Sequence, residues 1–263
     1  MGQDKRFLVD VGINNLPYPI VVNSRVDPLG QATVAVIGIQ TRIMQEFEAL
    51  WIDKFIHILH DHKGRVGTDT LKVNILDYLQ ELKASYAKVT FEYPFFMEKT
   101  APVSKEGNLV CYNCTYTVET NSLNDAPKAS IRIHIPVITT YPTSSNETPS
   151  SLFGQLSVVD IEVESDDKMN PEDIIDLVDR HALTPTYSYL SQEDQQHLIQ
   201  KIHSEEKYSV VMVDEIKKEL ARRNEITSSS IRCINHGMLH SFNTMISTEK
   251  SRGVPFSGIS DDF

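Results

Sequence analysis

The chain has 263 residues, a net charge of −11 at pH 7 and a hydrophobic share of 40%. This length permits one large domain or two small ones, with enough residues to bury a core. The negative charge argues against non-specific nucleic-acid binding, which needs clustered Lys and Arg, and no apolar run approaches the length of a membrane span. The first residues lack the apolar region of a secretory signal, and the three cysteines suit a reducing compartment. We therefore expect a cytoplasmic protein with no nucleic-acid or membrane partner.

The N-terminal half is expected to combine strands with two helices. Residues 1–31 are expected to be mostly extended and irregular, because Pro17 and Pro19 cannot lie inside a helix. Apolar spacing then changes from the period of a strand to that of a helix and back again. The predicted elements are a strand at 33–43, helices at about 48–62 and 70–84, and strands at 88–96, 108–119 and 129–140.

A polar stretch rich in Pro and Ser, at 141–151, marks the expected boundary between two halves. Asn170 followed by Pro171 has the pattern of a helix start, as does Ser191 before its acidic neighbours. The sequence predicts modules at 1–145 and 146–247 and a mobile acidic tail at 248–263. The predicted elements of the second module are a strand at 153–165, helices from 170 to 178, 191 to 203 and 209 to 223, and strands at 226–234 and 238–246.

Two segments of the N-terminal half carry a specific pattern. The first, from Tyr93 to Ser104, reads YPFFMEKTAPVS, and the second, from Ile135 to Ser145, reads IPVITTYPTSS. They resemble the YPFFxxKxAPVSG and VPVTSLCPCSK segments of the type IB GTP cyclohydrolases, metal-dependent enzymes that open the purine ring of GTP. Lys105 stands at the glycine of the first pattern. Tyr141 and Thr143 stand at the two cysteines of the second.

The resemblance covers roughly residues 9–246 and implies an α+β architecture, the tunnelling fold. In that fold an antiparallel sheet is backed by two helices, and here two tandem modules of this kind are expected. Sheets of several subunits join edge to edge into a barrel, which hides strand edges that would otherwise be exposed. The implied partners are further copies of the chain, in a dimer or tetramer, and a small-molecule ligand held between subunits.

The resemblance also assigns the metal ligands and the substrate anchor of that family to positions in this chain. A bound cation would activate water by lowering its pKa. The side chains at these positions lack the thiolate, carboxylate or imidazole of the family, so no metal cofactor is expected in the first reading. The matched positions are Thr143 for a cysteine, Phe153 for a histidine, Gln195 for a glutamate, Val210 for the glutamate that anchors the base, and Arg232 with Asn235 for the last two ligands.

A register shifted by one residue gives an alternative at the last segment. It places Cys233 and His236 at the Glu-x-x-His spacing of the family, with His240 four residues further on. These three side chains could hold a divalent metal such as Zn, Mn or Fe. In the other interpretation they belong to a strand and turn, where they are solvated or hydrogen-bonded.

Each of three other groups either contacts a ligand or has an ordinary structural role. Lys99 matches a lysine of the family and could contact a polyphosphate. His134 lies on the polar face of a predicted strand, where it meets either a phosphate or water. Cys111 and Cys114 form a CxxC within a strand, and since residues three apart point to opposite faces, they are expected to be ordinary thiols.

The sequence thus leaves three functional hypotheses. In the first, a divergent homologue has lost the metal-dependent ring opening and binds or converts another small molecule, using the polar set Thr143, Gln195 and Arg232. In the second, an active GTP cyclohydrolase or related hydrolase has a rebuilt Cys/His metal site. In the third, the chain is a non-catalytic partner of an active paralogue. The first is the main expectation, and the present ligand stays open.

Overall fold

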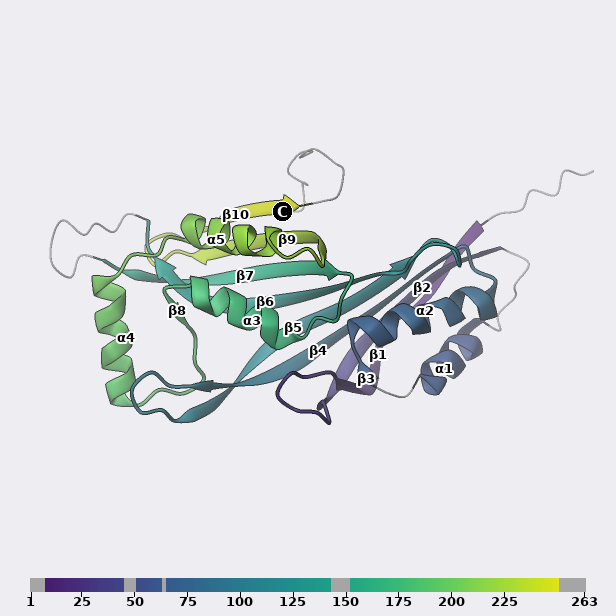
Figure 1. The fold of residues 1–263 in the computed structure, drawn as a ribbon, viewed down its shortest axis with the longest axis horizontal. Helices are drawn as coiled ribbons and strands as arrows, with labels where there is room; N and C mark the ends of the chain where they lie inside the picture. The colour runs from purple at the N-terminus through teal and green to yellow at the C-terminus, as the bar shows by residue number, and fades with distance from the viewer. Residues whose placement is uncertain (1–7, 45–50, 63–64, 143–151, 251–263) are drawn as a thin grey trace, which may run out of the picture. The chain divides into compact units, whose positions relative to one another are not determined.

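A computed structural model describes residues 8–44, 51–62, 65–142 and 152–250. It divides into two compact units that interleave along the chain (Figure 1). Unit 1 comprises residues 1–96, 111–132 and 167–173, and unit 2 comprises residues 97–110, 133–166 and 174–263. The expected modules 1–145 and 146–247 are a different, consecutive division, and that division stays a prediction.

Unit 1 is a sheet packed against two helices. Its strands follow the order β3-β1-β2-β4-β5, antiparallel except for the short parallel pair β1–β3. Phe55 of the first helix packs against Tyr78 of the second, and both side chains are buried. The elements are β1 (Leu8–Val22), β2 (Gln31–Met44), α1 (Trp51–Asp61), β3 (Arg65–Val66), α2 (Thr68–Leu82), β4 (Tyr86–Thr100), β5 (Gly107–Thr120) and the start of β6 (Lys128–Thr140).

Unit 2 continues from β6 in the order β6-β7-β9-β10, with the short β8 pairing with β6. Helix α5 packs on β9 and β10, where Met212 and Ile216 are buried with Ile231 and Cys233. Strands β4, β5 and β6 each give residues to both units. The remaining elements are β7 (Gly154–Ser165), α3 (Pro171–His181), β8 (Thr184–Pro185), α4 (Gln192–Ser204), α5 (Ser209–Ala221), β9 (Ile226–His236) and β10 (Asn243–Lys250).

The expected α+β class is confirmed, and every predicted helix is present within a few residues of its expected position. The extended course expected for residues 1–31 is found in β1, but its expected irregularity is wrong, because β1 pairs with β2 from Leu8 to Val22. On its other side β1 pairs with β3 only at Val21 and Val22. Pro17 and Pro19 therefore fit this strand, because no strand there needs a backbone N–H from them as a hydrogen-bond donor. Beyond Lys250, the tail lies outside the described residues.

No helix in the described ranges is both long and apolar enough to cross a membrane.

Candidate functional site

Four polar side chains form a row across the sheet of unit 2, and we call them the polar row. His134 of β6 lies with its Nε2 3.4 Å from Oδ1 of Asp160 on β7. Asp160 pairs in register with Arg232 on β9, and Arg232 pairs with Ser247 on β10. Directly opposed residues share a face of a sheet. The polar row therefore places an imidazole, a carboxylate and a guanidinium side by side.

The polar row lies on the face opposite the apolar core of unit 2. Ile133 and Ile135 flank His134 and are buried, whereas the His134 side chain is 45% exposed. Asp160 is buried with 8% of its surface exposed, between Val159 and Ile161. The imidazole is thus open to a ligand, while its carboxylate partner is held within the sheet.

The rows on either side of the polar row differ in character. On one side Val158, Ile234 and Met245 pair across three strands; on the other side Glu162, Ser230 and Glu249 do the same. The apolar row beside the polar row suits contact with a planar base, and the Arg232 guanidinium suits a phosphate group. A carboxylate that holds an imidazole in one orientation favours its use as a general base.

A chain of buried hydrogen bonds lies on the helix-facing side of the same strands. Gln155 Nε2 donates to Thr139 Oγ1 at 3.3 Å, and Thr139 and Ser157 share a 2.8 Å hydrogen bond. Ser157 in turn donates to Asn235 Oδ1 at 2.8 Å. All four side chains are buried. We call these residues, with the partners of Asn235 below, the amide network.

Asn235 is the branch point of the amide network. Its Nδ2 donates to Ser209 Oγ of α5 and to Thr244 Oγ1 of β10, both at 3.1 Å. The side-chain amide thus has partners on three other elements, which satisfies its hydrogen-bonding capacity in a buried place. This residue, at a ligand position implied by the resemblance, holds strands and helix together.

Lys99 makes a buried ion pair in unit 2. Its Nζ lies 2.6 Å from Oδ2 of Asp179 on α3 and donates to the Thr186 carbonyl at 3.5 Å. The Lys99 side chain is 6% exposed. Burial raises the pKa of Asp179, and the Lys99 charge opposes that rise. The polyphosphate contact expected for Lys99 stays a prediction, and in this structure its ammonium faces a carboxylate inside the protein.

The other positions assigned by the resemblance lie on separate elements. Gln195 is exposed near the start of α4 and donates to the Leu190 carbonyl at 3.0 Å. Val210 lies near the start of α5, 57% exposed. Thr143 lies outside the described residues. Of the predicted side chains, the structure brings together His134 and Arg232, through Asp160, a residue that the sequence interpretation did not single out.

Cys233, His236 and His240 do not converge. Cys233 is fully buried, and burial raises the pKa of its thiol to about 11, which disfavours the thiolate that binds metals. His236, three residues along the same strand, is exposed, and His240 stacks on Phe242 with ring centroids 4.8 Å apart. Within the described ranges no group of three or more His, Cys, Asp and Glu side chains is placed to hold a metal. The described side chains therefore do not fit the divalent metal that the resemblance implies.

Comparison with known proteins gives the family. A family model described as "Type I GTP cyclohydrolase folE2" matches residues 3–245. The chain belongs to the type I GTP cyclohydrolase family.

Curated relatives of this GTP cyclohydrolase family member match it over 80–89% of their own length. The protein named GTP cyclohydrolase FolE2 from Geobacter sp. strain M21 is 28% identical over 92% of the chain and 89% of the relative. Its namesake from Citrifermentans bemidjiense is 27% identical with the same coverage. That from Kosmotoga olearia is 26% identical over 81% of the chain and 80% of the relative.

Solved structures support the fold. The uricase from Arthrobacter globiformis has a TM-score of 0.52 at 9% identity and covers 96% of both chains. A uricase from Bacillus fastidious also has a TM-score of 0.52, at 10% identity and 92% coverage of both chains. Uricases of this kind have the tunnelling fold, so the expected fold is confirmed; identities this low support nothing beyond it.

The main functional expectation, a homologue without ring-opening chemistry, is wrong. The relatives that match over 92% of the chain at 25–28% identity are named GTP cyclohydrolases. That expectation assumed that activity requires the family's own side chains at the matched positions. The matching of positions through the resemblance can shift by one residue. The polar row brings two of the considered side chains, His134 and Arg232, together with Asp160, which such position-by-position reasoning did not consider.

Proposed function

We propose that this protein is a GTP cyclohydrolase that opens the purine ring of GTP by hydrolysis. The observation that carries the proposal is the match to curated GTP cyclohydrolases over 92% of the chain and 89% of the relatives. A match of that extent includes both compact units, which supports a common scaffold for the two proteins.

We assign the acid–base step to the polar row. His134, held by Asp160, removes a proton from the water that adds to a ring carbon of the base. Return of this proton to the ring nitrogen allows the carbon–nitrogen bond to break, so the ring opens with one water consumed. Arg232 supplies a planar set of donors for the triphosphate, and the neighbouring Val158 and Ile234 offer an apolar surface to the base.

A divalent metal such as Zn, Mn or Fe is the cofactor that the resemblance implies, and bound metal would activate water. No converging set of donors for it is present among the described side chains. Proton transfer is therefore assigned to His134, and the metal requirement is a variable of the assay below.

We also propose that the enzyme is a cytoplasmic homo-oligomer, a dimer or tetramer with GTP held between subunits. Strand β10 lies at the end of the strand order in the described part of the chain, and its hairpin with β9 exposes Met238, Leu239 and Phe242. An edge strand beside exposed apolar side chains is suited to pairing with another copy. Light scattering coupled to gel filtration measures the mass; a monomer at micromolar concentration would contradict an inter-subunit site.

The function is tested by GTP turnover, followed as loss of the guanine absorbance and of GTP on ion-exchange chromatography. The assay is run without metal and with Mn, Zn or Fe added. We expect turnover by the wild-type protein and a fall in kcat of about 100-fold or more in His134→Gln, the usual effect of removing a general base. Asp160→Asn is expected to lower kcat, and Arg232→Gln is expected mainly to raise KM.

The matched control is His57→Gln. His57 of α1 also has a carboxylate partner, with its Nε2 3.2 Å from Oδ2 of Asp61. It lies on a helix of unit 1, whereas the polar row lies on strands of unit 2. This variant should keep wild-type turnover. Absence of turnover under every metal condition would refute the function. Full activity in His134→Gln would refute only the assignment of the base.

A further inference from the structure

The sheet of unit 2 carries a further pair of hydrogen-bonding side chains on the face of the polar row. His236 of β9 pairs in register with Asn243 of β10, and both side chains are exposed. Directly opposed residues have their Cβ atoms about 5 Å apart, so the imidazole and the amide can contact one ligand together. From this arrangement we infer that His236 and Asn243 bind the Watson–Crick edge of the base and favour guanine over adenine. Their role rests on the function proposed above.

The pair lies beyond the apolar row, on the side away from the polar row. Alternate residues of β7 mark the three rows: Asp160 belongs to the polar row, Val158 to the apolar row, and Leu156 pairs with His236. Alternate residues of a strand point to the same face, so the three rows share a face of the sheet. A planar base on the apolar row therefore has the polar row at one end and His236 with Asn243 at the other. The apolar row consists of Val158, Ile234 and Met245.

The spacing of the rows agrees with the length of a purine. Residues two apart on a strand are separated by about 6.7 Å, so two such intervals span roughly 13 Å. A hydrogen bond of about 3 Å at each end leaves roughly 7 Å, which is close to the long dimension of guanine. The five-membered ring of the base can then face His134 while the Watson–Crick edge faces Asn243. Because the ribose is attached to the five-membered ring, this orientation also directs the phosphates toward Arg232.

Guanine makes one more hydrogen bond with this pair than adenine does. Guanine has O6 as an acceptor and its N1–H and 2-amino group as donors, whereas adenine has a 6-amino donor and no 2-amino group. A ring N–H of His236 donates to O6, and Oδ1 of Asn243 accepts from N1–H and from the 2-amino group. Adenine pairs with the same side chains only after the amide turns over and the imidazole changes tautomer, and it then makes two hydrogen bonds instead of three.

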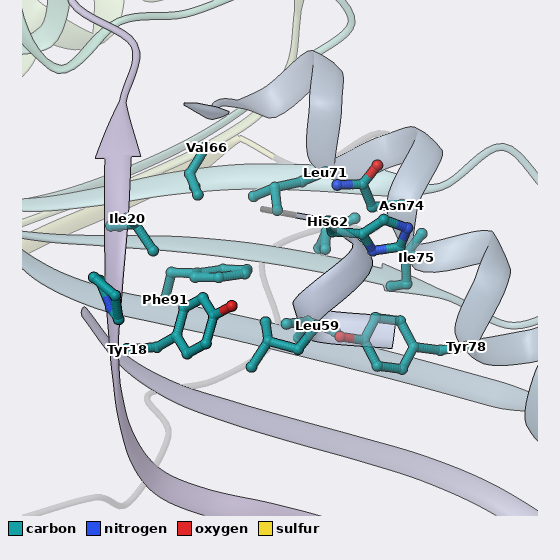
Figure 2. A pocket seen from close by; sticks show the side chains of 13 residues that line it. Tyr18, Ile20, Leu59, His62, Val66, Leu71, Asn74, Ile75, Tyr78 and Phe91 are labelled. Carbon is teal, nitrogen blue, oxygen red and sulfur yellow. The ribbon is translucent and has the colours of Figure 1, made fainter. Parts of the chain in front are cut away.

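The space between the sheet and the helices of unit 1 is too small to be an alternative site for the base. Figure 2 shows the rings of Tyr18, Tyr78 and Phe91 around this space, which is a cavity of about 30 Å³. Protein pockets for small molecules enclose roughly 300–1,000 Å³. The outer face of the unit 2 sheet is accessible, because Leu156 is 43% exposed and Met245 is 44% exposed. In the inter-subunit site proposed above, a second copy would cover the other face of the base.

The test uses 7-deaza-GTP and 7-deaza-ATP as probes. In both, a carbon replaces N7, which removes the carbon–nitrogen double bond to which water would add, so the ring stays closed while the Watson–Crick edge is unchanged. Binding to the full chain is measured by isothermal titration calorimetry. We expect the wild-type protein to bind 7-deaza-GTP about fivefold more tightly than 7-deaza-ATP, which is the effect of one net hydrogen bond.

Two variants at the pair have different expected patterns. Asn243→Leu removes two hydrogen bonds from guanine and one from adenine, so the affinity should fall about 25-fold for 7-deaza-GTP and about fivefold for 7-deaza-ATP, and the preference should disappear. His236→Leu removes one hydrogen bond from each, so both affinities should fall about fivefold and the preference should remain. The matched control is Asn113→Leu, at an exposed residue of β5 in unit 1, which should keep both wild-type affinities.

Turnover of GTP is measured on the same proteins, so that failure of the base recognition and failure of the proposed reaction can be told apart. If the wild type turns over GTP but Asn243→Leu binds 7-deaza-GTP as tightly as the wild type, the inference is overturned and the proposed function stands. If GTP is not turned over but the expected binding pattern is found, the reaction is wrong and the base recognition stands. Absence of binding by the wild type, or equal affinity for the two probes, overturns the inference.

Discussion

Lys105 adopts a backbone conformation that favours glycine. Its φ is 63°, in the loop between β4 and β5, at the position where the type I cyclohydrolase pattern has a glycine. A non-glycine residue in this left-handed region costs about 1–2 kcal/mol. Its side chain recovers little, because the hydrogen bond from Nζ to the Pro102 carbonyl is exposed. The lysine is therefore a local strain, at a position where the sequence departs from the glycine of the pattern.

Lys105→Gly is expected to stabilise the protein. Relief of strain outweighs the greater flexibility that glycine gives the unfolded chain, so the unfolding free energy should rise by roughly 0.5–1 kcal/mol. Denaturant unfolding measures this difference. Glu106→Gly, next in the loop and with no positive φ, is the control and should lower the unfolding free energy instead. A loss of stability in Lys105→Gly would show that the lysine side chain is required there.

The amide network predicts a large effect from a change that conserves volume. Asn235→Leu keeps the size of the side chain but leaves the hydroxyls of Ser157, Ser209 and Thr244 without their amide partner. Ser157 keeps its hydrogen bond to Thr139 and Thr244 is exposed, so Ser209 is the buried hydroxyl that loses this partner. A buried group left unsatisfied costs about 1–3 kcal/mol, and we expect the unfolding free energy to fall by about this amount. The same substitution at the exposed Asn243 of β10 should change it by less than about 0.5 kcal/mol. Equal effects at the two positions would mean that the network adds no stability.

The properties of single residues can be predicted where they depend on neighbouring residues in the sequence alone. The opposite orientations expected for Cys111 and Cys114 are confirmed, since one is exposed and the other buried. Asp160 was not predicted, although a carboxylate between the apolar residues Val159 and Ile161 is visible in the sequence. Its contact with His134 depends on the pairing of β6 with β7, and strand pairing is set by tertiary packing rather than by spacing along one strand.

At the scale of an element, a helix end can be predicted from local sequence, but its contacts with distant segments cannot. The start of α4 is confirmed as a cap: Ser191 accepts from the Asp194 backbone, and the Asp194 side chain accepts in return from the Ser191 N–H. Asp194 also accepts from the backbone N–H groups of Val103 and Ser104. Burial would raise the pKa of Asp194, but these hydrogen bonds lower it well below its ordinary value. The cap could be predicted from four consecutive residues, whereas the contact some ninety residues away could not.

Helices α3 and α5 are joined by a cluster of charges centred on Glu219. Its carboxylate accepts from His181 at 2.9 Å, Arg180 at 2.8 Å and Arg223 at 3.1 Å. Burial acts to raise its pKa, but these donors dominate and lower it from 4.5 to about 2. On the same histidine, Glu215 lies 3.2 Å from Nδ1 and also pairs with Lys207 at 2.6 Å. The cluster is therefore sensitive to acid.

The sign of the pH dependence follows from the lowered pKa of Glu219. Because the pKa in the folded state lies below that in the unfolded state, the unfolded chain binds the proton first. The stabilisation is present above pH 4.5 and is lost as the pH falls toward 2. In Glu219→Gln the unfolding free energy should fall less steeply between about pH 5 and about pH 2 than in the wild type. Urea unfolding at a series of pH values measures this slope. Glu205→Gln, whose carboxylate lies 3.9 Å from Lys201, is the control and should keep the wild-type slope; identical slopes in all three proteins would contradict this role for Glu219.

At the scale of the whole chain, the two compact units share their strands. Residues 97–110 and 133–145 precede the predicted boundary at 145 but belong to unit 2, and residues 167–173 follow it but belong to unit 1. In unit 1 the Glu172 side chain accepts from Ser24 Oγ and the Arg25 N–H. Composition marked the polar stretch at 141–151 as a boundary, yet composition carries no information on which distant segments complete a core.

The interleaving predicts that residues 1–145 do not form a stable domain alone. Such a fragment keeps Ser24 and Tyr116 but loses Glu172 and the Met169 carbonyl, which accepts from the Tyr116 hydroxyl at 3.2 Å. It also exposes side chains such as Ile135 that are fully buried in unit 2. We expect its circular dichroism melt to be broad and to occur below that of the full chain. A synthetic peptide of residues 165–176 should raise the melting temperature of the fragment, and the same peptide with Glu172 replaced by Ala should raise it less. A sharp transition of the fragment at the temperature of the full chain would instead establish the consecutive modules as the folding units.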